Sequence, residues 1–433
     1  MNTGARTGSM RAMRGVVLAA VVVGVCFLAF HASPRPFWHH TFDLRVYRGA
    51  VRWWLEGRPL YDFVRPNTEK GFTYPPFAVL VLLPVGLGTE TTATILLTAL
   101  SGGLVVLTTW WLVAPIATRH GVPRWVAVGV AVPLVVALEP VRETLGWGQI
   151  DLVIAALVLA DVVALRRGRA WAGAGIGLAT AIKVTPGLFL AYLIVTRRWR
   201  AAAVAVGVFG VTVLAGFAVD PSLRYWTSVL WQTSRVGPPA DLNDQSLLGL
   251  LARLAAPSAP SSVLWLVVAG LALAVGITRA AMLHRRGDDL AGVTVIGLTA
   301  GLISPISWVH HLYWVVPAVV VLVDVAAGTP VAGPAARRHP RAARAAAGIL
   351  ALVVVGAFAG SLIWYFQRLP AGPWTTAGEN AYVLIVLALV LVLPARSTAG
   401  RAPPGAGVPW PHGRSLRGPS AGQGNLRRRR RAD

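Results

Sequence analysis

The chain has 433 residues, of which 55% are hydrophobic and only 13% are charged. Soluble domains carry about 25% charged residues, so a chain of this length with half that share cannot cover its surface with polar groups. The composition excludes an ordinary soluble protein and indicates a membrane protein.

The formal net charge of +23 could suggest a nucleic-acid partner, but the position of the charges argues against one. The arginines gather in short clusters between apolar runs: RTGSMRAMR at the start, RRGR at 166–169, RRWR at 197–200, HRR at 284–286, RRHPRAAR at 337–344 and RRRRR at 427–431. Polytopic membrane proteins have cytoplasmic loops rich in Lys and Arg. We therefore expect membrane lipids, and no nucleic acid, as partners. The single cysteine, Cys26, excludes an internal disulfide and a Cys-based metal site.

The apolar runs predict an all-α polytopic membrane protein with about 11–13 membrane helices. In chain order they are residues 15–31, 77–117, 125–138, 150–165, 171–196, 201–219, 262–282, 290–303, 312–326, 345–365 and 380–394. The second run is interrupted by Pro84 and Gly88, and the fifth by Pro186, so we expect both to bend or fold back.

A consistent orientation follows if the basic N-terminus is cytoplasmic and run 171–196 enters and returns as two half-helices. Every arginine cluster then lies inside, and the outer loops are 32–76, 139–149, 220–261, 304–311 and 366–379. Residues 1–394 would form one membrane domain, and 395–433, rich in Pro, Gly and Arg, a disordered basic cytoplasmic tail. A cleaved signal peptide stays open for the first segment, because HASP follows its apolar run.

The first outer loop contains FDLRVYRGAVRWW at 42–54, which predicts an amphipathic helix at the membrane surface. On such a helix Asp43, Tyr47, Ala50, Val51 and Trp54 share one face, and Arg45, Arg48 and Arg52 share the opposite one. Two interpretations of the acid stay open and are compatible. Asp43 could cap the helix, or it could be a general base turned toward the protein, where partial desolvation raises its basicity.

Two further outer stretches are rich in polar and aromatic residues. FTYPPF at 72–77 is typical of a rigid loop-to-helix entry, and Tyr74 could also belong to an aromatic wall for a sugar or an isoprenoid. EPVRETLGWGQID at 139–151 packs five polar groups between two apolar runs, which suggests the rim of a pocket that binds hydroxyls: Glu139, Arg142, Glu143, Gln149 and Asp151.

Lys183 stands inside the run that is expected to fold back, where a cation is costly and therefore indicates function. We expect it to face a lipid phosphate, with snorkelling to the nearer surface as the alternative. SPISWVHHLYW at 304–314 adds His310 and His311. Adjacent histidines point to different sides of a helix, so we interpret one of them as a donor to phosphate or sugar and expect no metal.

Together these segments resemble a known family, the actinobacterial polyprenol-phosphate-mannose-dependent alpha-mannosyltransferases of GT-C type. The resemblance spans most of the chain to residue 320, in family order, on Asp43 to Tyr47 with Arg48, FTYPPF, GWGQIDLVIAALVLAD at 146–161, GLATAIKVTP at 177–186, QSLLGLLAR at 245–253 and SPISWVHH at 304–311. The chain departs from the family pattern at Asp151 and Asp244, where asparagine is common, which leaves the acceptor and the sugar open.

The resemblance implies a GT-C fold and an inverting glycosyltransferase without a cofactor. It would take mannose from a polyprenyl-phosphate donor outside the cell membrane and pass it to a glycolipid or glycan. Asp43 would be the base. Lys183, His310 or His311, and Arg253 would balance the charge of the departing phosphate. The sugar and the acceptor would be held by Tyr47, Arg48, Tyr74, Glu139, Arg142, Gln149, Asp151, Gln245 and Trp308.

Three alternatives stay open. The donor could carry arabinofuranose in place of mannose. Acids and a lysine within apolar runs, namely Asp161, Asp324 and Lys183, are also compatible with a membrane transporter. A structural scaffold would have no activity, and its tryptophans would only anchor it at the interface.

Overall fold

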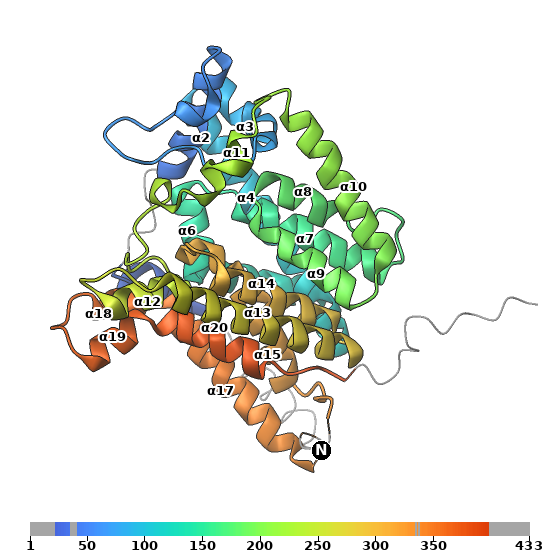
Figure 1. Ribbon diagram of the computed structural model, residues 1–433. Coiled ribbons are helices and arrows are strands. Elements are labelled where there is room, and N and C mark those ends of the chain that lie inside the picture. The colour runs from blue at the N-terminus through green and yellow to red at the C-terminus, as the bar shows by residue number, and fades with distance from the viewer. Residues whose placement is uncertain (1–21, 35–40, 334–335, 337, 398–433) are drawn as a thin grey trace, which may run out of the picture. The chain divides into compact units, whose positions relative to one another are not determined.

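The computed structural model describes residues 22–34, 41–333, 336 and 338–397, and in these ranges the chain is helical (Figure 1). The expected basic tail lies mostly outside the described residues, as do the start of the first apolar run and the arginines near the N-terminus. Among the described residues the only β-pairings are isolated bridges, such as Asp244 with Trp308, so the predicted all-α class is confirmed.

The helices follow one another with short connections. They are η1(Leu28–Ala32), α2(Phe42–Leu55), η2(Leu60–Asp62), α3(Phe77–Leu87), α4(Glu90–Arg119), α5(Arg124–Ala137), α6(Glu139–Trp147), α7(Asp151–Arg166), α8(Ala174–Ile182), η3(Thr185–Gly187), α9(Leu188–Val195), α10(Trp199–Gly216), α11(Arg224–Thr227), η4(Val229–Trp231), η5(Thr233–Arg235), α12(Leu247–Ala255), α13(Ser262–Arg285), α14(Asp289–Ile303), η6(Val309–Trp314), α15(Val315–Ala326), α17(Pro340–Ala359), α18(Ile363–Phe366), α19(Pro373–Glu379) and α20(Ala381–Val392).

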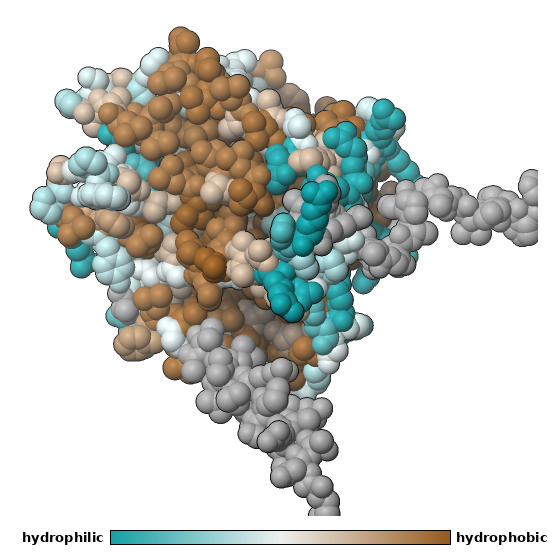
Figure 2. Space-filling model, turned by 90° about the horizontal axis from the view of Figure 1, so that it is seen from below, coloured by the Kyte–Doolittle hydropathy of each residue, from teal (hydrophilic) through white to brown (hydrophobic). Residues whose placement is uncertain are grey.

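The chain is a multi-pass membrane protein. By length and composition, five helices of the described part can cross a membrane, or up to seven if each of two bent pairs is one span. The larger number expected from the sequence includes shorter apolar helices of 10–17 residues, such as Phe77–Leu87 and Asp289–Ile303. Hydrophobic side chains cover a broad continuous area of the face in Figure 2. Such a surface is stable against lipid and not against water.

Two helix breaks expected from the sequence are present. The run 77–117 divides at Gly88 and Thr89 into α3 and α4, whereas Pro84 lies inside α3 without ending it. The run 171–196 divides at Lys183, whose backbone is extended between α8 and η3. The break places extended backbone and a charged side chain within an apolar run, which a membrane protein tolerates only where protein or a cavity surrounds them.

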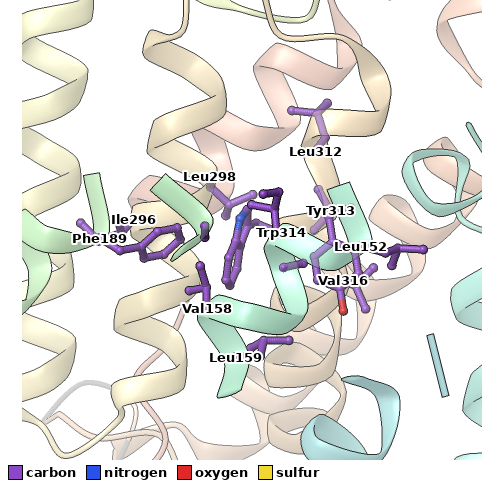
Figure 3. Close-up of a cluster of buried hydrophobic side chains, with 14 of the residues drawn as sticks. Leu152, Val158, Leu159, Phe189, Ile296, Leu298, Leu312, Tyr313, Trp314 and Val316 are labelled. Atoms are coloured by element: carbon purple, nitrogen blue, oxygen red, sulfur yellow. The ribbon is translucent and has the colours of Figure 1, made fainter. Parts of the chain in front are cut away.

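The core gathers around α14, in which every residue from Leu290 to Leu302 is buried. It packs against α13, α15, α20 and α9. Figure 3 shows the core beside it, where the rings of Phe189 and Trp314 lie 4.9 Å apart. Gly297 allows this packing, because a side chain there would come 2.2 Å from the Trp314 ring. The short elements η3 and η6 thus pack against α14, a helix that is buried along most of its length.

Loops that the orientation places on the same side contact one another. On the side expected to be outer, Asp244 accepts a hydrogen bond from the Ser307 backbone, and Gln245 donates to the Glu379 carbonyl. On the other side, Arg198 pairs with Asp289 at 2.7 Å, which joins two loops expected to be cytoplasmic. The contacts agree with the predicted partition of the loops into two sets.

The packed part of the chain extends past residue 394, where the tail is expected to begin. Arg396 is buried and pairs with Asp288 at 2.7 Å and with Asp324 at 3.1 Å. Asp324 also pairs with Arg119, and His120 lies 2.9 Å from it. Two buried carboxylates need cationic partners, and the first residues of the expected tail supply one of them.

Candidate active site

Asp43 lies in the first turn of α2, the amphipathic helix expected from the sequence. The N-cap is Thr41, with left-handed backbone at φ 46°, so Asp43 is not the capping residue itself. It lies two positions further, where the helix dipole favours a negative charge. Tyr47 follows one helical turn later on the same face. The start of α2 therefore turns a carboxylate and a phenol toward the protein.

The GWGQI segment brings α6 close to this turn. Gly148 ends α6 with φ 69°, and a side chain there would come 2.9 Å from Leu44 Cβ and 3.3 Å from Thr41 Cβ. Only glycine combines this backbone with so close an approach. The Thr41 amide donates to the Gly146 carbonyl at 3.3 Å. As a result Gln149, the next residue, lies beside Asp43.

A chain of hydrogen bonds links Asp43 to two tyrosines. Gln149 Nε2 donates to Asp43 Oδ2 at 2.8 Å, and Tyr47 donates to Gln149 Oε1 at 2.5 Å. The Tyr47 and Tyr74 hydroxyls lie 3.0 Å apart. Asp43 is partly buried, and the other three residues are buried. The structure thus brings together four residues expected at the site, from α2, the FTYPPF loop and the GWGQI segment.

A second cluster lies next to the first. Lys183 Nζ donates to Asp151 Oδ1 at 2.8 Å, and His310 Nε2 is 4.0 Å from Asp151 Oδ2. The rings of His310 and His311 are 4.6 Å apart. The Lys183 ammonium also lies 5.8 Å from the centre of the Tyr74 ring. Lysine, aspartate and two histidines from the broken helix, α7 and η6 therefore meet beside the Asp43 chain.

Asp151, Lys183 and His311 of this cluster border a hollow with about 520 Å³ of empty space, a figure that includes the open solvent at its mouth. Its charged and hydroxyl lining comes from Asp151, Lys183, Thr185, His311, Ser304, Ser307 and Tyr313, and its apolar lining includes Ile154, Phe189 and Trp314. Asp43 is not among the lining residues; its hydrogen-bonded chain extends to Tyr74, whose ring lies 5.8 Å from the Lys183 ammonium at the hollow. A cationic group and apolar side chains in the lining of one hollow suit a ligand with an anionic head and a hydrocarbon tail.

Burial raises the pKa of Asp43 to about 7. The Asp151 carboxylate also raises this pKa, whereas the hydrogen bond from Gln149 lowers it. The positive charges of Lys183 and Lys70 lower it as well. Arg65 is a further cation within electrostatic range of Asp43. A carboxyl group with a pKa near neutrality can accept a proton in one step of a reaction and lose it again.

His310 and His311 are adjacent residues of η6, a 3-10 segment, and their rings lie edge to face. Ligand atoms of Asp151, His310 and His311 all lie within 4.8 Å of one another. The Lys183 ammonium shares the Asp151 carboxylate, and a cation at 2.8 Å opposes a second cation there. The cluster therefore fits an anion better than a metal ion.

Other residues expected to bind sugar, acceptor or phosphate lie elsewhere, with protein partners. Arg48, placed on the polar face of the helix, is buried and donates to the Val85, Gly88 and Thr89 carbonyls at the end of α3. Gln245 donates to the Leu242 and Glu379 carbonyls and accepts from the Val383 amide. Arg253 donates to the Asn380 side chain and to the Asp241 and Asp244 carbonyls. Trp308 lies against Gly237 and Lys70.

Glu139 and Arg142 are fully buried where α5 and α6 meet at a 70° bend. Glu139 accepts hydrogen bonds from the Trp364 indole and the Tyr382 hydroxyl. Arg142 donates to the Ala29, Ala137 and Ala359 carbonyls and to Ser361. These contacts hold the bend, and they differ from the pocket rim expected from the sequence.

Lys70 and Thr185 are among the residues at the site that were not singled out from the sequence. Lys70, in a hairpin closed by the Val64–Gly71 bridge, donates to the Val236 carbonyl at 2.5 Å and contributes charge near Asp43. It is one of the chain's two lysines, which was the available signal. Thr185, directly after the Lys183 break, lines the cavity. In the sequence, the KVTP motif around Thr185 indicated a helix break, and it gave no sign that the Thr185 hydroxyl would face a cavity.

Comparison with known proteins agrees with the sequence resemblance. Glycosyltransferase family 87 matches residues 72–305. The polyprenol-phosphate-mannose-dependent alpha-(1-2)-phosphatidylinositol mannoside mannosyltransferase of Mycobacterium tuberculosis is 33% identical over 325 residues, which are 71% of this chain and 74% of that protein. The corresponding phosphatidylinositol pentamannoside mannosyltransferase of Mycolicibacterium smegmatis is 32% identical over 377 residues, 80% of this chain and 83% of that protein.

The chain belongs to glycosyltransferase family 87. Its matched range includes Tyr74, Gln149, Asp151 and Lys183, while Asp43 precedes it. Among solved structures, ArnT from Cupriavidus metallidurans bound to undecaprenyl phosphate is similar at 17% identity and a TM-score of 0.34, over 87% of this chain and 75% of that one. Family membership removes the transporter and scaffold alternatives. The acids that favoured a transporter have protein partners: Asp161 accepts from the Ile176 amide, and Asp324 pairs with Arg396.

Proposed function

We propose that the protein is an inverting membrane mannosyltransferase of GT-C type. It moves a mannosyl residue from a polyprenyl-phosphate donor to a hydroxyl group of a lipid-linked mannoside or a related cell-envelope glycan. The names of relatives that are 32–36% identical support both the donor and the acceptor class. They carry different acceptor names at similar identity, so we propose the class and not one acceptor.

The observation that carries the proposal is the position of Asp43. Its carboxylate is held by Gln149, has a pKa of about 7, and lies near a cationic cluster that borders a hollow with apolar residues in its lining. One-step inversion needs a base on the acceptor side and charge stabilisation on the leaving-group side. Two neighbouring clusters with these opposite properties provide both.

In the proposed reaction, the acceptor oxygen forms a bond to the anomeric carbon while the bond from that carbon to the phosphate oxygen breaks. The acceptor proton passes to Asp43, and the electron pair of the broken bond stays on the phosphate. A glycosidase needs a second carboxyl group to protonate its leaving group. Here the phosphate leaves as a stable anion, which Lys183 and His311 at the cavity would bind.

Mannose is favoured over arabinofuranose because the relatives that match over 65–80% of this chain are named for mannose. The arabinofuranose donor remains the second candidate sugar. Assays with each labelled polyprenyl-phosphate sugar decide between them, since a preference for the pentose donor contradicts this part of the proposal.

We also propose that the site faces the outer side of the cell membrane. The loops around Asp43, Gln149, Asp244 and Ser307 belong to the set without arginine clusters. The loops of the other set carry the clusters at 166–169, 197–200 and 284–286. An outer site would meet the head groups of donor and acceptor in the same leaflet.

The test is Asp43→Asn, which keeps the shape and an oxygen that can accept from Gln149 but cannot take a proton. Removing a general base lowers kcat by about 10²–10⁴-fold. Transfer should be measured with purified enzyme in lipid nanodiscs, labelled donor and a phosphatidylinositol mannoside acceptor. Asp62→Asn is the matched control, because Asp62 is an exposed acid of the same outer segment that pairs only with Arg224 among the described residues. Turnover of Asp43→Asn within tenfold of the parent removes Asp43 from the role of base.

A further inference from the structure

The side-chain amide of Gln149 has both ends occupied by protein groups. Its nitrogen donates to Asp43 Oδ2 at 2.8 Å, and its oxygen accepts from Tyr47 at 2.5 Å and, more weakly, from Tyr74 at 3.4 Å. The residue is 5% exposed. Its oxygen and one of its two N–H groups thus bind protein groups, and Gln149 is not among the residues that line the cavity, which favours a role toward Asp43 over a contact with a sugar.

We propose that Gln149 is a positioning residue for Asp43, and that Tyr47 fixes the orientation of the Gln149 amide. This inference rests on the proposed role of Asp43 as the base. It assigns to Gln149 a role different from the sugar or acceptor contact expected from the sequence, and it gives the Tyr47 hydroxyl a role without contact to substrate.

The direction of the hydrogen bonds carries the argument. A carboxylate can only accept, so the amide must turn its NH₂ group toward Asp43. This orientation leaves the amide oxygen facing Tyr47, whose hydroxyl supplies the donor. Tyr47 can in turn accept from Tyr74, whose hydroxyl is 3.0 Å away and whose single proton serves either Tyr47 or the amide oxygen. Each group then donates toward the carboxylate. Flipping the amide would set its oxygen against the Asp43 carboxylate, which cannot donate, so the carboxylate selects the orientation and the Tyr47 hydroxyl holds the amide oxygen in it.

The chain of hydrogen bonds through Gln149 cannot carry the acceptor proton away from Asp43, because an amide nitrogen does not titrate near neutral pH. Gln149 therefore acts on the place and the ionisation of Asp43 and not on the proton's fate. The charged groups that act on Asp43 are Asp151 and Lys183 of the second cluster and Lys70 and Arg65 of the hairpin. Among the described residues none of the four hydrogen-bonds to Asp43, and its side chain is held by the Gln149 amide alone.

Gln149→Met tests the role, because methionine keeps the length and apolar volume of glutamine without its polar ends. The acid limb of the kcat/KM profile reports the base of the free enzyme. A lost hydrogen bond to a carboxylate disfavours its charged form, so the limb should move up by about one pH unit. At pH 7 we expect about a fivefold loss, mainly in kcat, with the donor KM changed by less than about twofold.

Tyr47→Phe is the second variant, and it removes a single oxygen atom. It should move the acid limb in the same direction by a smaller amount, since Tyr74 still reaches the amide oxygen. The double variant should shift no further than Gln149→Met alone, because Tyr47 acts through Gln149. Tyr382→Phe is the matched control: this buried hydroxyl binds Glu139 and the Ala357 carbonyl, so its loss should lower the unfolding temperature without moving the limb.

An acid limb that stays in place in Gln149→Met and Tyr47→Phe overturns the inference, as does a double variant whose shift is the sum of the two. If Gln149→Met does not fold, the position of the acid limb in the Tyr47→Phe variant alone tests the inference. The failure of the inference can be told from the failure of the proposed function. An inactive Asp43→Asn with an unmoved limb in both variants rejects only the role of Gln149, whereas an active Asp43→Asn rejects the base itself.

Discussion

Transfer should depend steeply on pH near neutrality, because the pKa of Asp43 is about 7 and the reaction needs its carboxylate. At pH 8 about nine tenths of the enzyme would carry the charged form, and at pH 6 about one tenth, so kcat/KM should fall about ninefold between pH 8 and pH 6 and approach a tenfold fall per pH unit at lower pH. An aspartate with its ordinary pKa of 3.8 would be charged throughout this range, and the profile would be flat.

The assay is the initial rate of mannose transfer in nanodiscs between pH 5.5 and 8.5, at constant ionic strength and with donor and acceptor below their KM values. The donor is a phosphodiester and does not titrate in this range, so a limb near pH 7 belongs to the protein. The residual rate of Asp43→Asn should lack this limb. A flat profile in the parent enzyme refutes the account of a partly desolvated base.

The same shift has a consequence for stability. The folded pKa of Asp43 lies above its unfolded value, so the folded state binds the proton more tightly. Its contribution to stability is complete at low pH and is lost as the pH rises through about 7. The active, charged form is therefore the less stable one. Asp43→Asn should flatten this part of the dependence of the unfolding temperature on pH, while the buried Asp244, whose pKa is about 6, contributes in a lower window.

Two more predictions concern the donor cluster and the orientation. Lys183→Met should remove the phosphate contact and also leave the nearly buried Asp151 carboxylate without its cation, at a cost on the order of 3–5 kcal/mol in the free energy of unfolding. Adding Asp151→Leu to this variant should restore the unfolding temperature but not the transfer activity. Recovery of both the unfolding temperature and the transfer activity contradicts the phosphate-binding role of Lys183. A cysteine placed at Asp62 in a Cys26→Ser background should react with a membrane-impermeant maleimide added outside intact cells, and labelling only after the membrane is opened contradicts the outer site.

Much of the site was predictable because it rests on local rules. The amphipathic spacing of 42–54 predicted α2 and the inward face of Asp43, and Gly88 marked the break after α3. The cost of a lysine within an apolar run marked Lys183. These signals act within a few residues, so the sequence displays them directly.

The residues that could not be assigned depend on partners far along the chain. Arg142 donates hydrogen bonds to Ala29 and Ser361, which lie 113 and 219 residues away in the sequence. No local sequence pattern distinguishes an arginine with such structural contacts from one that binds a sugar. Arg48 was placed on the polar face by helical spacing alone. Its burial follows from the free carbonyls at the end of α3, which lie next to it only in the folded protein.

The charge balance of the two clusters explains how one carboxylate suffices at a membrane surface. During transfer a proton moves to Asp43, and one negative charge moves from Asp43 to the departing phosphate, so the total charge of the site does not change. In surroundings of low dielectric constant, such a displacement is far less costly than the creation of a charge. The negative charge moves away from Asp43, whose partial burial favours its neutral form, and toward the Lys183 ammonium at the cavity. The Asp151–Lys183 pair keeps this cation in place before the donor binds, at the point where negative charge will accumulate.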